Sequence, residues 1–467
     1  MRRRLLPLAL LAAALAAPSG APAAGFSPPV AVSPKAELGQ PAAAVAPTGR
    51  TAVAWLAAPS RKQGFRLVAR VGDAPEQLAP AVPIPGSAHA SEPRLAAAPD
   101  STITACWQVD AYRRRGAIRC AVAPPSQAFG AARTLATYRA GTQLALTGLA
   151  VDGTGRSVVA WKRSSGRGRY SLTVAIGAAG GSFGRPAVLG TTDSYAEVQL
   201  ATGGAGEVAA LWSVSKGRAI SPRTPFLATL APGAPAFGRA TAVTLPVEEE
   251  GTPMLRGGRA LSLLAGGEDG PVALLRGGAG AGGALRPVRL ASPTAVRGAS
   301  PAEALVSVQP DGSTFAVTRF VAVADTDCSE ETRSQLFAAT LPAGAPGPPA
   351  TLVPLSDPRQ LVSTWDVAEL ADGRTIIVWG DGFGFDRRSR VEFAVRTPDG
   401  ALSRATTIAP TAADYPVLAS GGTHAVLVLL TGKRLDGPSQ VLLSTFRDTA
   451  PFAPTGPRPA HPSTGCA

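Results

Sequence analysis

The chain has 467 residues, of which 45% are hydrophobic, 16% charged and 5% aromatic, and its formal net charge is +13. The hydrophobic content excludes a disordered chain, and the 52 Gly and 44 Pro residues argue against a fold of long helices. Many short strands joined by turns fit this composition better. The sequence contains no Asn, so it lacks N-glycosylation sites and Asn-Gly hairpin turns.

The first 24 residues have the pattern of a signal peptide. Arg2, Arg3 and Arg4 precede an apolar stretch over residues 5–17, which is shorter than the roughly 20 residues that a membrane-spanning helix needs. Residues 21–23, Ala-Pro-Ala, offer a cleavage site. We therefore expect residues 1–24 to be removed and the mature protein to be secreted or otherwise extracytoplasmic, without a transmembrane segment. An uncleaved anchor is the alternative.

A seven-residue motif recurs along the rest of the chain. Three copies are nearly identical, namely Gly49-Arg-Thr-Ala-Val-Ala-Trp55, Gly155-Arg-Ser-Val-Val-Ala-Trp161 and Gly373-Arg-Thr-Ile-Ile-Val-Trp379. Residues 206–212 keep the Gly-to-Trp spacing, and weaker copies lie at residues 101–107, 258–264, 312–318 and 422–428. Eight copies with a period of roughly 50 residues are typical of a repeat architecture.

Each copy contains four strand signals: a small apolar run such as residues 94–98, the motif itself, a third run such as residues 171–175, and a Pro-tolerant outer run such as residues 183–189. We therefore predict an all-β fold, a β-propeller of eight four-stranded blades, with seven blades as the alternative. The predicted propeller spans residues 25–455, followed by a tail over residues 456–467. Residues 26–32 look like a fourth strand and are predicted to close the ring in the last blade, although residues 452–454 compete for that place.

These repeats resemble secreted bacterial β-propeller proteins in general. Residues 151–155 and 309–315 also resemble the Asp-box turn of sialidase-like propellers. The spacing departs from the Asp-box pattern in most copies, so no sialidase catalytic residue is carried over to this chain. The resemblance therefore implies a fold and no specific family or reaction.

The four cysteines fit an oxidising compartment, because an even number in an exported chain permits two disulfides. Cys106 and Cys120 fall on the predicted second and third strands of one copy, where cross-strand pairing is geometrically reasonable. Cys328 would then pair with Cys466. Free buried thiols are the alternative, and the spacings do not suit zinc.

Two motifs with chemical associations fall in predicted turns between third and fourth strands. Residues 180–184 fit the serine-hydrolase pattern G-x-S-x-G, but that nucleophile needs a strand-to-helix elbow. Residues 278–283 fit G-x-G-x-x-G without the helix that binds a pyrophosphate. The three histidines, His89, His424 and His461, have no metal-ligand spacing. The acidic residues 325–331 offer carboxylates for Ca²⁺, but a solvated loop is favoured there, and we expect no cofactor.

Basic residues concentrate in the predicted hairpins between second and third strands, which a propeller presents on one face. Six copies contribute to this predicted basic rim, which contains Arg61, Lys62, Arg113, Arg114, Arg115, Arg163, Arg167, Arg169, Arg218, Arg387, Arg388 and Arg434. Acidic and amide residues fall near the start of the first strand in six copies and predict a ring at the channel mouth: Gln40, Glu92, Glu197, Glu303, Asp366 and Asp414. A plain solvated surface is the alternative, since hairpin tips are polar in any fold.

A basic rim attracts anionic polymers through its local positive potential. We therefore predict a non-catalytic, monomeric propeller with a binding or scaffold role at the cell surface, for an anionic polysaccharide or wall polymer. Specific nucleic-acid recognition is not expected, because few aromatic residues lie beside these arginines. The alternative is an exported carbohydrate hydrolase or lyase, which would need two carboxylates about 5 to 9 Å apart at the channel mouth.

Overall fold

The computed structural model describes residues 25–447 except for a set of connecting segments. Those segments are 59–63, 110–115, 140–141, 143, 165–169, 193–197, 216–222, 245–253, 257–261, 266–272, 277–285, 290–299, 309–312, 327–328, 342–351, 358–359, 382–389, 409–412 and 433–437. The predicted signal peptide, the tail and the competing segment 452–454 lie outside the described residues, so they stay predictions. Within the described part every regular element is a β-strand, and the strands form eight antiparallel sheets.

The first four sheets, blades 1 to 4, each contain four strands in chain order. Blade 1 consists of β3 (Leu38–Val45), β4 (Thr51–Ala57), β5 (Arg66–Gly72) and β6 (Val82–Ala88). Blade 2 consists of β7 (Ala90–Ala97), β8 (Ile103–Val109), β9 (Gly116–Ala123) and β10 (Arg133–Tyr138). Blade 3 consists of β11 (Leu144–Val151), β12 (Ser157–Ser164), β13 (Tyr170–Ile176) and β14 (Ala187–Thr192). Blade 4 consists of β15 (Gln199–Thr202), β16 (Val208–Ser215), β17 (Arg223–Leu230) and β18 (Thr241–Ala242).

Blades 5 to 7 repeat this order, and blade 8 differs at its rim. Blade 5 consists of β19 (Met254–Arg256), β20 (Ser262–Ala265), β21 (Ala273–Arg276) and β22 (Arg286–Arg289). Blade 6 consists of β23 (Ser300–Val308), β24 (Thr314–Thr326), β25 (Ser329–Leu341) and β26 (Val353–Pro354). Blade 7 consists of β27 (Val362–Glu369), β28 (Thr375–Asp381), β29 (Arg390–Arg396) and β30 (Thr406–Ile408). Blade 8 consists of β31 (Ala413–Gly421), β32 (His424–Gly432) and β33 (Ser439–Arg447), joined by β1 (Gly25–Phe26) and β2 (Val30–Ala31).

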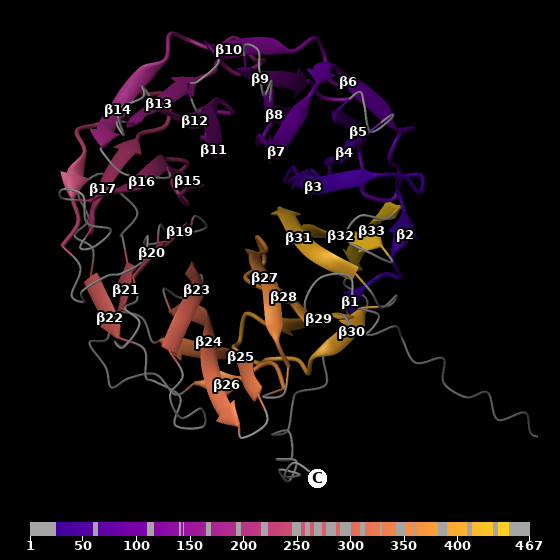
Figure 1. The fold of residues 1–467 in the computed structure, drawn as a ribbon, viewed down its shortest axis with the longest axis vertical. Coiled ribbons are helices and arrows are strands. Elements are labelled where there is room, and N and C mark those ends of the chain that lie inside the picture. The colour runs from indigo at the N-terminus through magenta and orange to yellow at the C-terminus, as the bar shows by residue number, and fades with distance from the viewer. Residues whose placement is uncertain are drawn as a thin grey trace, which may run out of the picture.

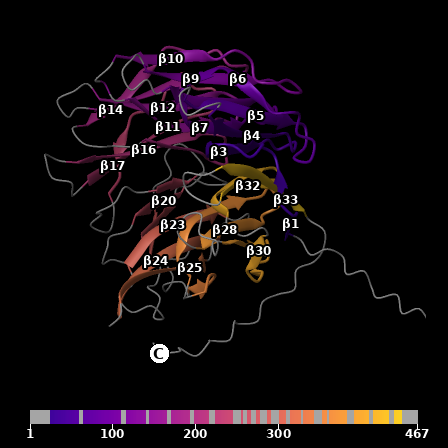
Figure 2. The same cartoon turned by 45° about the vertical axis from the view of Figure 1, so that its right-hand side comes forward.

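The eight sheets are arranged as the blades of a ring (Figure 1), with the first strand of each blade innermost and the last strand at the rim. The prediction of an eight-bladed propeller is confirmed, and the seven-bladed alternative is excluded. The ring is closed by the amino-terminal strands, because β1 and β2 pair antiparallel with β33. Figures 1 and 2 both show β1 beside β33, although the two strands belong to opposite ends of the chain.

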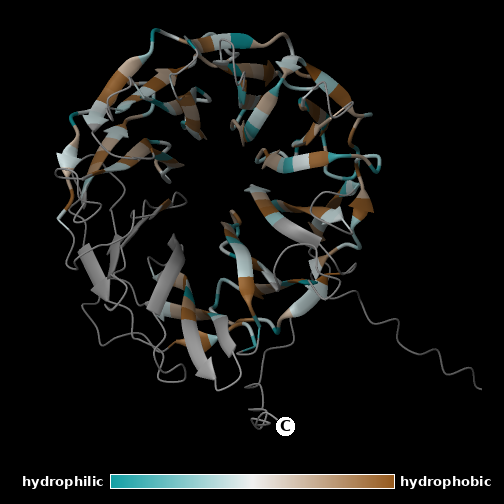
Figure 3. Ribbon diagram, viewed as in Figure 1, coloured by the Kyte–Doolittle hydropathy of each residue, from teal (hydrophilic) through white to brown (hydrophobic). Residues whose placement is uncertain are grey.

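The hydrophobic core is divided among the junctions between blades. The tryptophans that end five copies of the motif are at most 2% exposed: Trp55, Trp107, Trp161, Trp212 and Trp379. Trp107 of blade 2, for example, packs in one cluster with Leu67 and Ile84 of blade 1. Many strand residues are accordingly hydrophobic, whereas the connections are mostly hydrophilic (Figure 3).

The glycine that opens the motif ends a tight turn between the first and second strands. In blade 1 the N–H of Gly49 donates to the carbonyl of Ala46 at 2.9 Å, and the N–H of Ala46 donates to the carbonyl of Arg50 at 2.8 Å. Gly49 has a φ of 90°, a conformation that glycine adopts without steric cost. In blade 2 Ser101 occupies this place with a φ of 70°, so the turn geometry is kept there despite the strain of a side chain.

Blade 6 carries a longer hairpin than the sequence patterns indicate. Its strands β24 and β25 have 13 residues each, and their pairing extends to Asp325 opposite Glu330 and Thr326 opposite Ser329. The prediction of a solvated loop over residues 325–331 is therefore wrong for the backbone. The β-branched and aromatic residues of β24 favour a strand over the intervening stretch. The absence of a Ca²⁺ site there stays a prediction.

The predicted disulfide between Cys106 and Cys120 is confirmed. The two residues lie directly opposite each other on β8 and β9, with their Cα atoms 4.1 Å apart. A bridge over so short a loop stabilises the fold by about 3 kcal/mol in the chain-entropy model. Cys328 and Cys466 lie outside the described residues, so their pairing stays a prediction.

Candidate functional site

The antiparallel strand order gives the ring two faces that carry different sets of connections. The connections between second and third strands leave at the same end of each blade as the passage from the last strand to the next blade. We call this end the hairpin face. The turns between first and second strands, and between third and fourth strands, lie at the other end, which we call the turn face. The predicted basic rim belongs to the hairpin face.

One residue of the predicted rim has a described position, Arg163 near the end of β12, where its side chain is exposed. The other eleven lie in connecting segments outside the described residues: Arg61, Lys62, Arg113, Arg114, Arg115, Arg167, Arg169, Arg218, Arg387, Arg388 and Arg434. The rim as a whole therefore stays a prediction.

Arg163 lies beside a second arginine that the sequence patterns did not single out. Arg139 follows β10 in the connection from blade 2 to blade 3, and the two side chains line a polar cavity of about 310 Å³ together with Thr137, Tyr138 and Thr142. Both arginines are exposed, and the structure gives neither side chain a hydrogen bond or ion pair among the described residues. The repeated hairpin pattern does not mark Arg139, because this residue lies in a connection between blades, although such connections share the hairpin face.

Tyr138 is held in place at this cavity. A Cβ atom on Gly116 would lie 1.8 Å from the Tyr138 ring, so this strand position on β9 must be a glycine. The Tyr138 hydroxyl donates to the carbonyl of Val109 at 3.5 Å, a long contact that adds little by itself. The ring thus gives the cavity a fixed wall between blades 2 and 3.

The residues predicted at the channel mouth lie near the starts of the innermost strands. Those whose exposure the structure describes are Gln40 and Glu92, which are exposed, and Asp366, which is half-buried. Glu303 and Asp414 lie on β23 and β31, and Glu197 lies outside the described residues. An acidic ring around the mouth therefore stays a prediction.

The innermost strands carry bulges that the sequence patterns did not reveal. In six blades the pairing register shifts near the start of the innermost strand, at these residues: Gln40, Glu92, Pro93, Thr147, Ala302, Ser363, Tyr415 and Pro416. Bulges accommodate proline and redirect side chains. Glu92 has a φ of 47°, a strained conformation for a residue with a side chain. Two predicted mouth residues, Gln40 and Glu92, thus occupy redirected positions.

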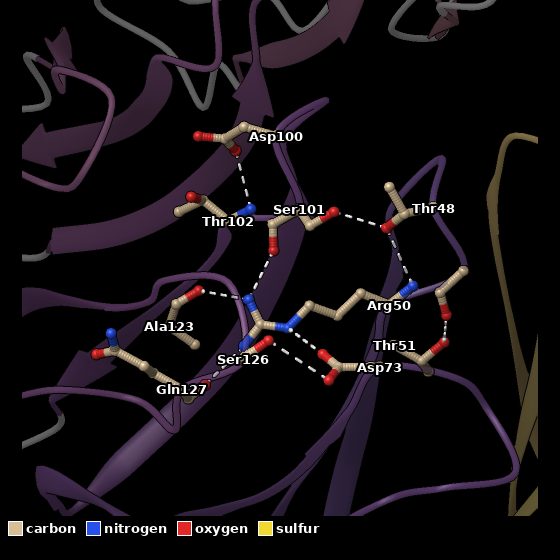
Figure 4. Close-up of polar contacts among 11 residues, drawn as sticks. Thr48, Arg50, Thr51, Asp73, Asp100, Ser101, Thr102, Ala123, Ser126 and Gln127 are labelled. Atoms are coloured by element: carbon tan, nitrogen blue, oxygen red, sulfur yellow. Dashed lines mark hydrogen bonds and ion pairs between the residues drawn. The ribbon is translucent and has the colours of Figure 1, made fainter.

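On the turn face, the arginine of the repeated motif is a contact between blades. Arg50 is 2% exposed, and its guanidinium donates to the carbonyls of Ser101 at 2.7 Å, Ala123 at 3.2 Å and Gln127 at 2.6 Å, all in blade 2 (Figure 4). Burial lowers the pKa of the guanidinium, although the carboxylates of Asp73 and Asp100 oppose that change. Arg50 therefore joins blade 1 to blade 2.

In two further copies of the motif, the arginine likewise contacts the next blade along the chain. Arg156 donates to the carbonyl of Ala234 in blade 4 at 2.7 Å, and Arg374 lies over the ring of Phe446 in blade 8, 5.3 Å from its centroid. Each is oriented by an aspartate of its own turn. Nε of Arg156 lies 2.8 Å from an oxygen of Asp152.

The aspartates of these turns are ionised structural groups. Burial acts to raise the pKa of Asp152, but hydrogen bonds from Thr154 and Arg156 and the charge of Arg156 outweigh it and hold that pKa below its usual range. The same balance, with hydrogen bonds from Arg374 and its charge, lowers the pKa of Asp372. Both carboxylates are therefore committed to positioning an arginine, which leaves them unsuited to proton transfer near neutral pH.

The G-x-S-x-G segment lies in a turn between third and fourth strands, as predicted, whereas residues 278–283 and His461 lie outside the described residues. Ser182 of the G-x-S-x-G segment is exposed in a turn between β13 and β14, where its carbonyl accepts the N–H of Ala178 at 2.6 Å. Among the described residues, no three His, Cys, Asp or Glu side chains are grouped to hold a metal ion. His424 packs against Gly49 of the neighbouring blade. In the same part of the chain, no helix has the length and hydropathy needed to cross a membrane.

Comparisons with known proteins find propellers among solved structures. The propeller domain of the trilobed protease from Pyrococcus furiosus is 10% identical, with 81% of this chain and 96% of that one covered and a TM-score of 0.45. An α-L-arabinanase from Penicillium chrysogenum in complex with arabinobiose is 11% identical, with 90% and 98% covered and a TM-score of 0.39. No family model and no curated protein sequence matches the chain.

Proposed function

We propose that the protein is an exported binding or scaffold propeller whose hairpin face attracts an anionic polysaccharide or wall polymer at the cell surface. The observation that carries this proposal is the pair Arg139 and Arg163, which line one polar cavity with exposed side chains. Guanidinium groups recognise carboxylate and phosphate oxygens in a planar, bidentate geometry. The amino-terminal sequence pattern and the Cys106–Cys120 disulfide support an extracytoplasmic location.

Binding of this kind is expected to be weak, salt-dependent and indifferent to polymer sequence. The two arginines offer charge without an aromatic platform wider than Tyr138, so they read acidic groups and not the identity of a sugar. Attraction between exposed charges falls as salt shortens the screening length. The net charge, +13 for the whole chain and +10 without Arg2, Arg3 and Arg4 of the predicted signal peptide, adds a long-range attraction to anionic polymers.

Replacing Arg139 and Arg163 together by Glu is expected to weaken binding to immobilised polygalacturonate about tenfold at low salt. The reason is that two positive groups at the cavity become two negative ones, and about 1.4 kcal/mol corresponds to this factor. The measurement is a polygalacturonate affinity by surface plasmon resonance in about 50 mM salt, repeated near 300 mM, where screening is stronger.

A charge-matched control is the pair Arg133→Glu and Arg404→Glu, whose side chains are exposed toward the turn face. This control variant is expected to lose only the small part of the affinity for polygalacturonate that depends on the net charge of the whole protein. Equal losses in both double variants would contradict a site on the hairpin face. Release of reducing ends or unsaturated sugars during incubation would instead support the alternative of a hydrolase or lyase.

A further inference from the structure

A groove of about 800 Å³ lies between blades 3 and 4 toward the turn face, away from the proposed polymer-binding face. Its apolar lining includes Ile176, Phe183 and Val188 from blade 3 and Phe237 from blade 4. Arg156 also lines it, and this arginine is already held by Asp152 and the carbonyl of Ala234. The groove thus has an apolar wall and a floor in which Arg156 is held in place by contacts between blades.

Two further arginines line this groove from equivalent positions of the two blades. The sequence Phe-Gly-Arg occurs at residues 183–185 and again at residues 237–239. The glycine N–H fixes each copy, donating to the carbonyl of Ile176 at 2.9 Å in blade 3 and of Thr229 at 2.8 Å in blade 4. Arg185 and Arg239 are exposed, and the structure gives neither side chain a hydrogen bond or ion pair among the described residues.

The outer wall of the groove is an available strand edge. β14 is the outermost strand of blade 3 and pairs only with β13 among the described strands. Val188 on β14 is 61% exposed, and no proline lies within Ala187–Thr192. An edge strand of this kind presents backbone N–H and C=O groups that an extended peptide can pair with.

The equivalent groove between blades 1 and 2 provides an internal comparison. It measures about 370 Å³, and its outer strand β6 contains Pro83 and Pro85, which have no N–H to donate. The exposed carboxylate of Asp73 also lines it. Among the described residues a second groove of this kind thus lies between blades 1 and 2, but there the strand edge is blocked by proline and the charge of Asp73 does not suit an acidic ligand.

We propose that the groove between blades 3 and 4 binds an extended acidic peptide segment of another protein, which adds a strand to the edge of β14. Side chains alternate along a strand, so a peptide of alternating apolar and acidic residues places its apolar groups in the groove beside Val188. Its carboxylates then pair with Arg185 and Arg239. This partner differs in face and in chemical class from the polymer proposed above.

The test uses a fluorescein-labelled peptide of alternating Glu and Val, six residues long, and measures its affinity for the mature protein by fluorescence anisotropy. Replacing Arg185 and Arg239 together by Glu is expected to weaken binding at least tenfold. The charge-matched pair Arg133→Glu and Arg404→Glu is expected to change it less than twofold. Because these side chains are exposed, all variants are expected to fold, and circular dichroism checks this.

Two matched changes separate the groove from its blocked counterpart and from simple charge attraction. Val188→Glu is expected to weaken binding at least fivefold, whereas Val82→Glu, an exposed position on β6, is expected to leave it unchanged. A peptide N-methylated on alternate amides, which cannot complete a strand ladder, is expected to bind at least tenfold more weakly.

Equal binding by the groove variant and the charge-matched control would overturn the proposal, as would equal binding of the methylated peptide. Loss of peptide binding through Arg139→Glu and Arg163→Glu, with no loss through the groove variant, would place the peptide on the hairpin face and also overturn it. Polymer binding by the groove variant is expected to remain, so failure of this proposal and failure of the proposed function are distinguishable.

Discussion

Replacing Arg50 by Ala is expected to lower the free energy of unfolding by about 3 kcal/mol. The Arg50 guanidinium is buried and satisfies the carbonyls of Ser101, Ala123 and Gln127 in the neighbouring blade. Its removal leaves these carbonyls without their donor, and the contacts with Ser101 and Ala123 are buried, so the loss costs more than that of exposed hydrogen bonds. The measurement is urea unfolding of the mature protein, followed by tryptophan fluorescence.

The matched control is Arg133→Ala, which removes an exposed arginine from the outer strand β10 and is expected to change the unfolding free energy by less than about 0.5 kcal/mol. Arg50→Lys is expected to lie between the two, because one ammonium cannot reach all three carbonyls. The ion pair of Arg50 with the exposed Asp73, at 3.7 Å, contributes little to this difference. Equal unfolding midpoints for Arg50→Ala and Arg133→Ala would contradict the assignment of Arg50 as a contact between blades.

Deleting residues 25–31, which contain β1 and β2, is expected to destabilise the mature protein by at least about 4 kcal/mol. The deletion removes Phe26, whose ring meets Phe393 of blade 7 and Phe446 of blade 8 edge-on at centroid distances of 5.1 and 5.5 Å. It also exposes the edge of β33, which favours association between copies. Thermal unfolding with light scattering measures both effects.

Two single substitutions in the same segment compare the contribution of the Phe26 ring with that of an exposed side chain. Phe26→Ala is expected to cost about 2 kcal/mol, since the ring is partly buried. Val30→Ala, at a side chain that is 65% exposed, is expected to cost less than about 0.5 kcal/mol. A deletion variant with the melting temperature of the intact mature protein would show that β1 and β2 do not close the ring.

The sequence was most informative where one backbone requirement recurs, at the turn positions 49, 155, 206 and 373. Glycine at the turn before the second strand takes a positive φ, and the tryptophan that follows is buried at the junction with the neighbouring blade. The spacing of Gly49 and Trp55 was therefore enough to predict a blade from the sequence. The closing strand was predictable for a similar reason, because Phe26 begins it as Phe183 and Phe237 precede the fourth strands of their own blades.

The contacts between blades were not predictable in the same way. Arg50 bonds to residues 51, 73 and 77 positions further along the chain, and only the folded ring brings them together. The strand pairing at the end of the blade 6 hairpin was not predicted, because the acidic residues there suggested a solvated loop, although the pairing of β24 with β25 continues through Asp325. Of the two arginines that line the cavity, only Arg163 was predicted from the sequence. Arg139 lies in a connection between blades that no repeated motif marks.

The most direct test of the proposed function is hydrogen–deuterium exchange of the mature protein with and without polygalacturonate at low salt. The account predicts slower exchange in the hairpin-face segments 110–115, 137–143 and 163–169, and unchanged exchange in the turn-face segments 46–50 and 152–156. Slower exchange confined to the turn face, or no change in the presence of polymer that binds the protein, would contradict a polymer-binding hairpin face.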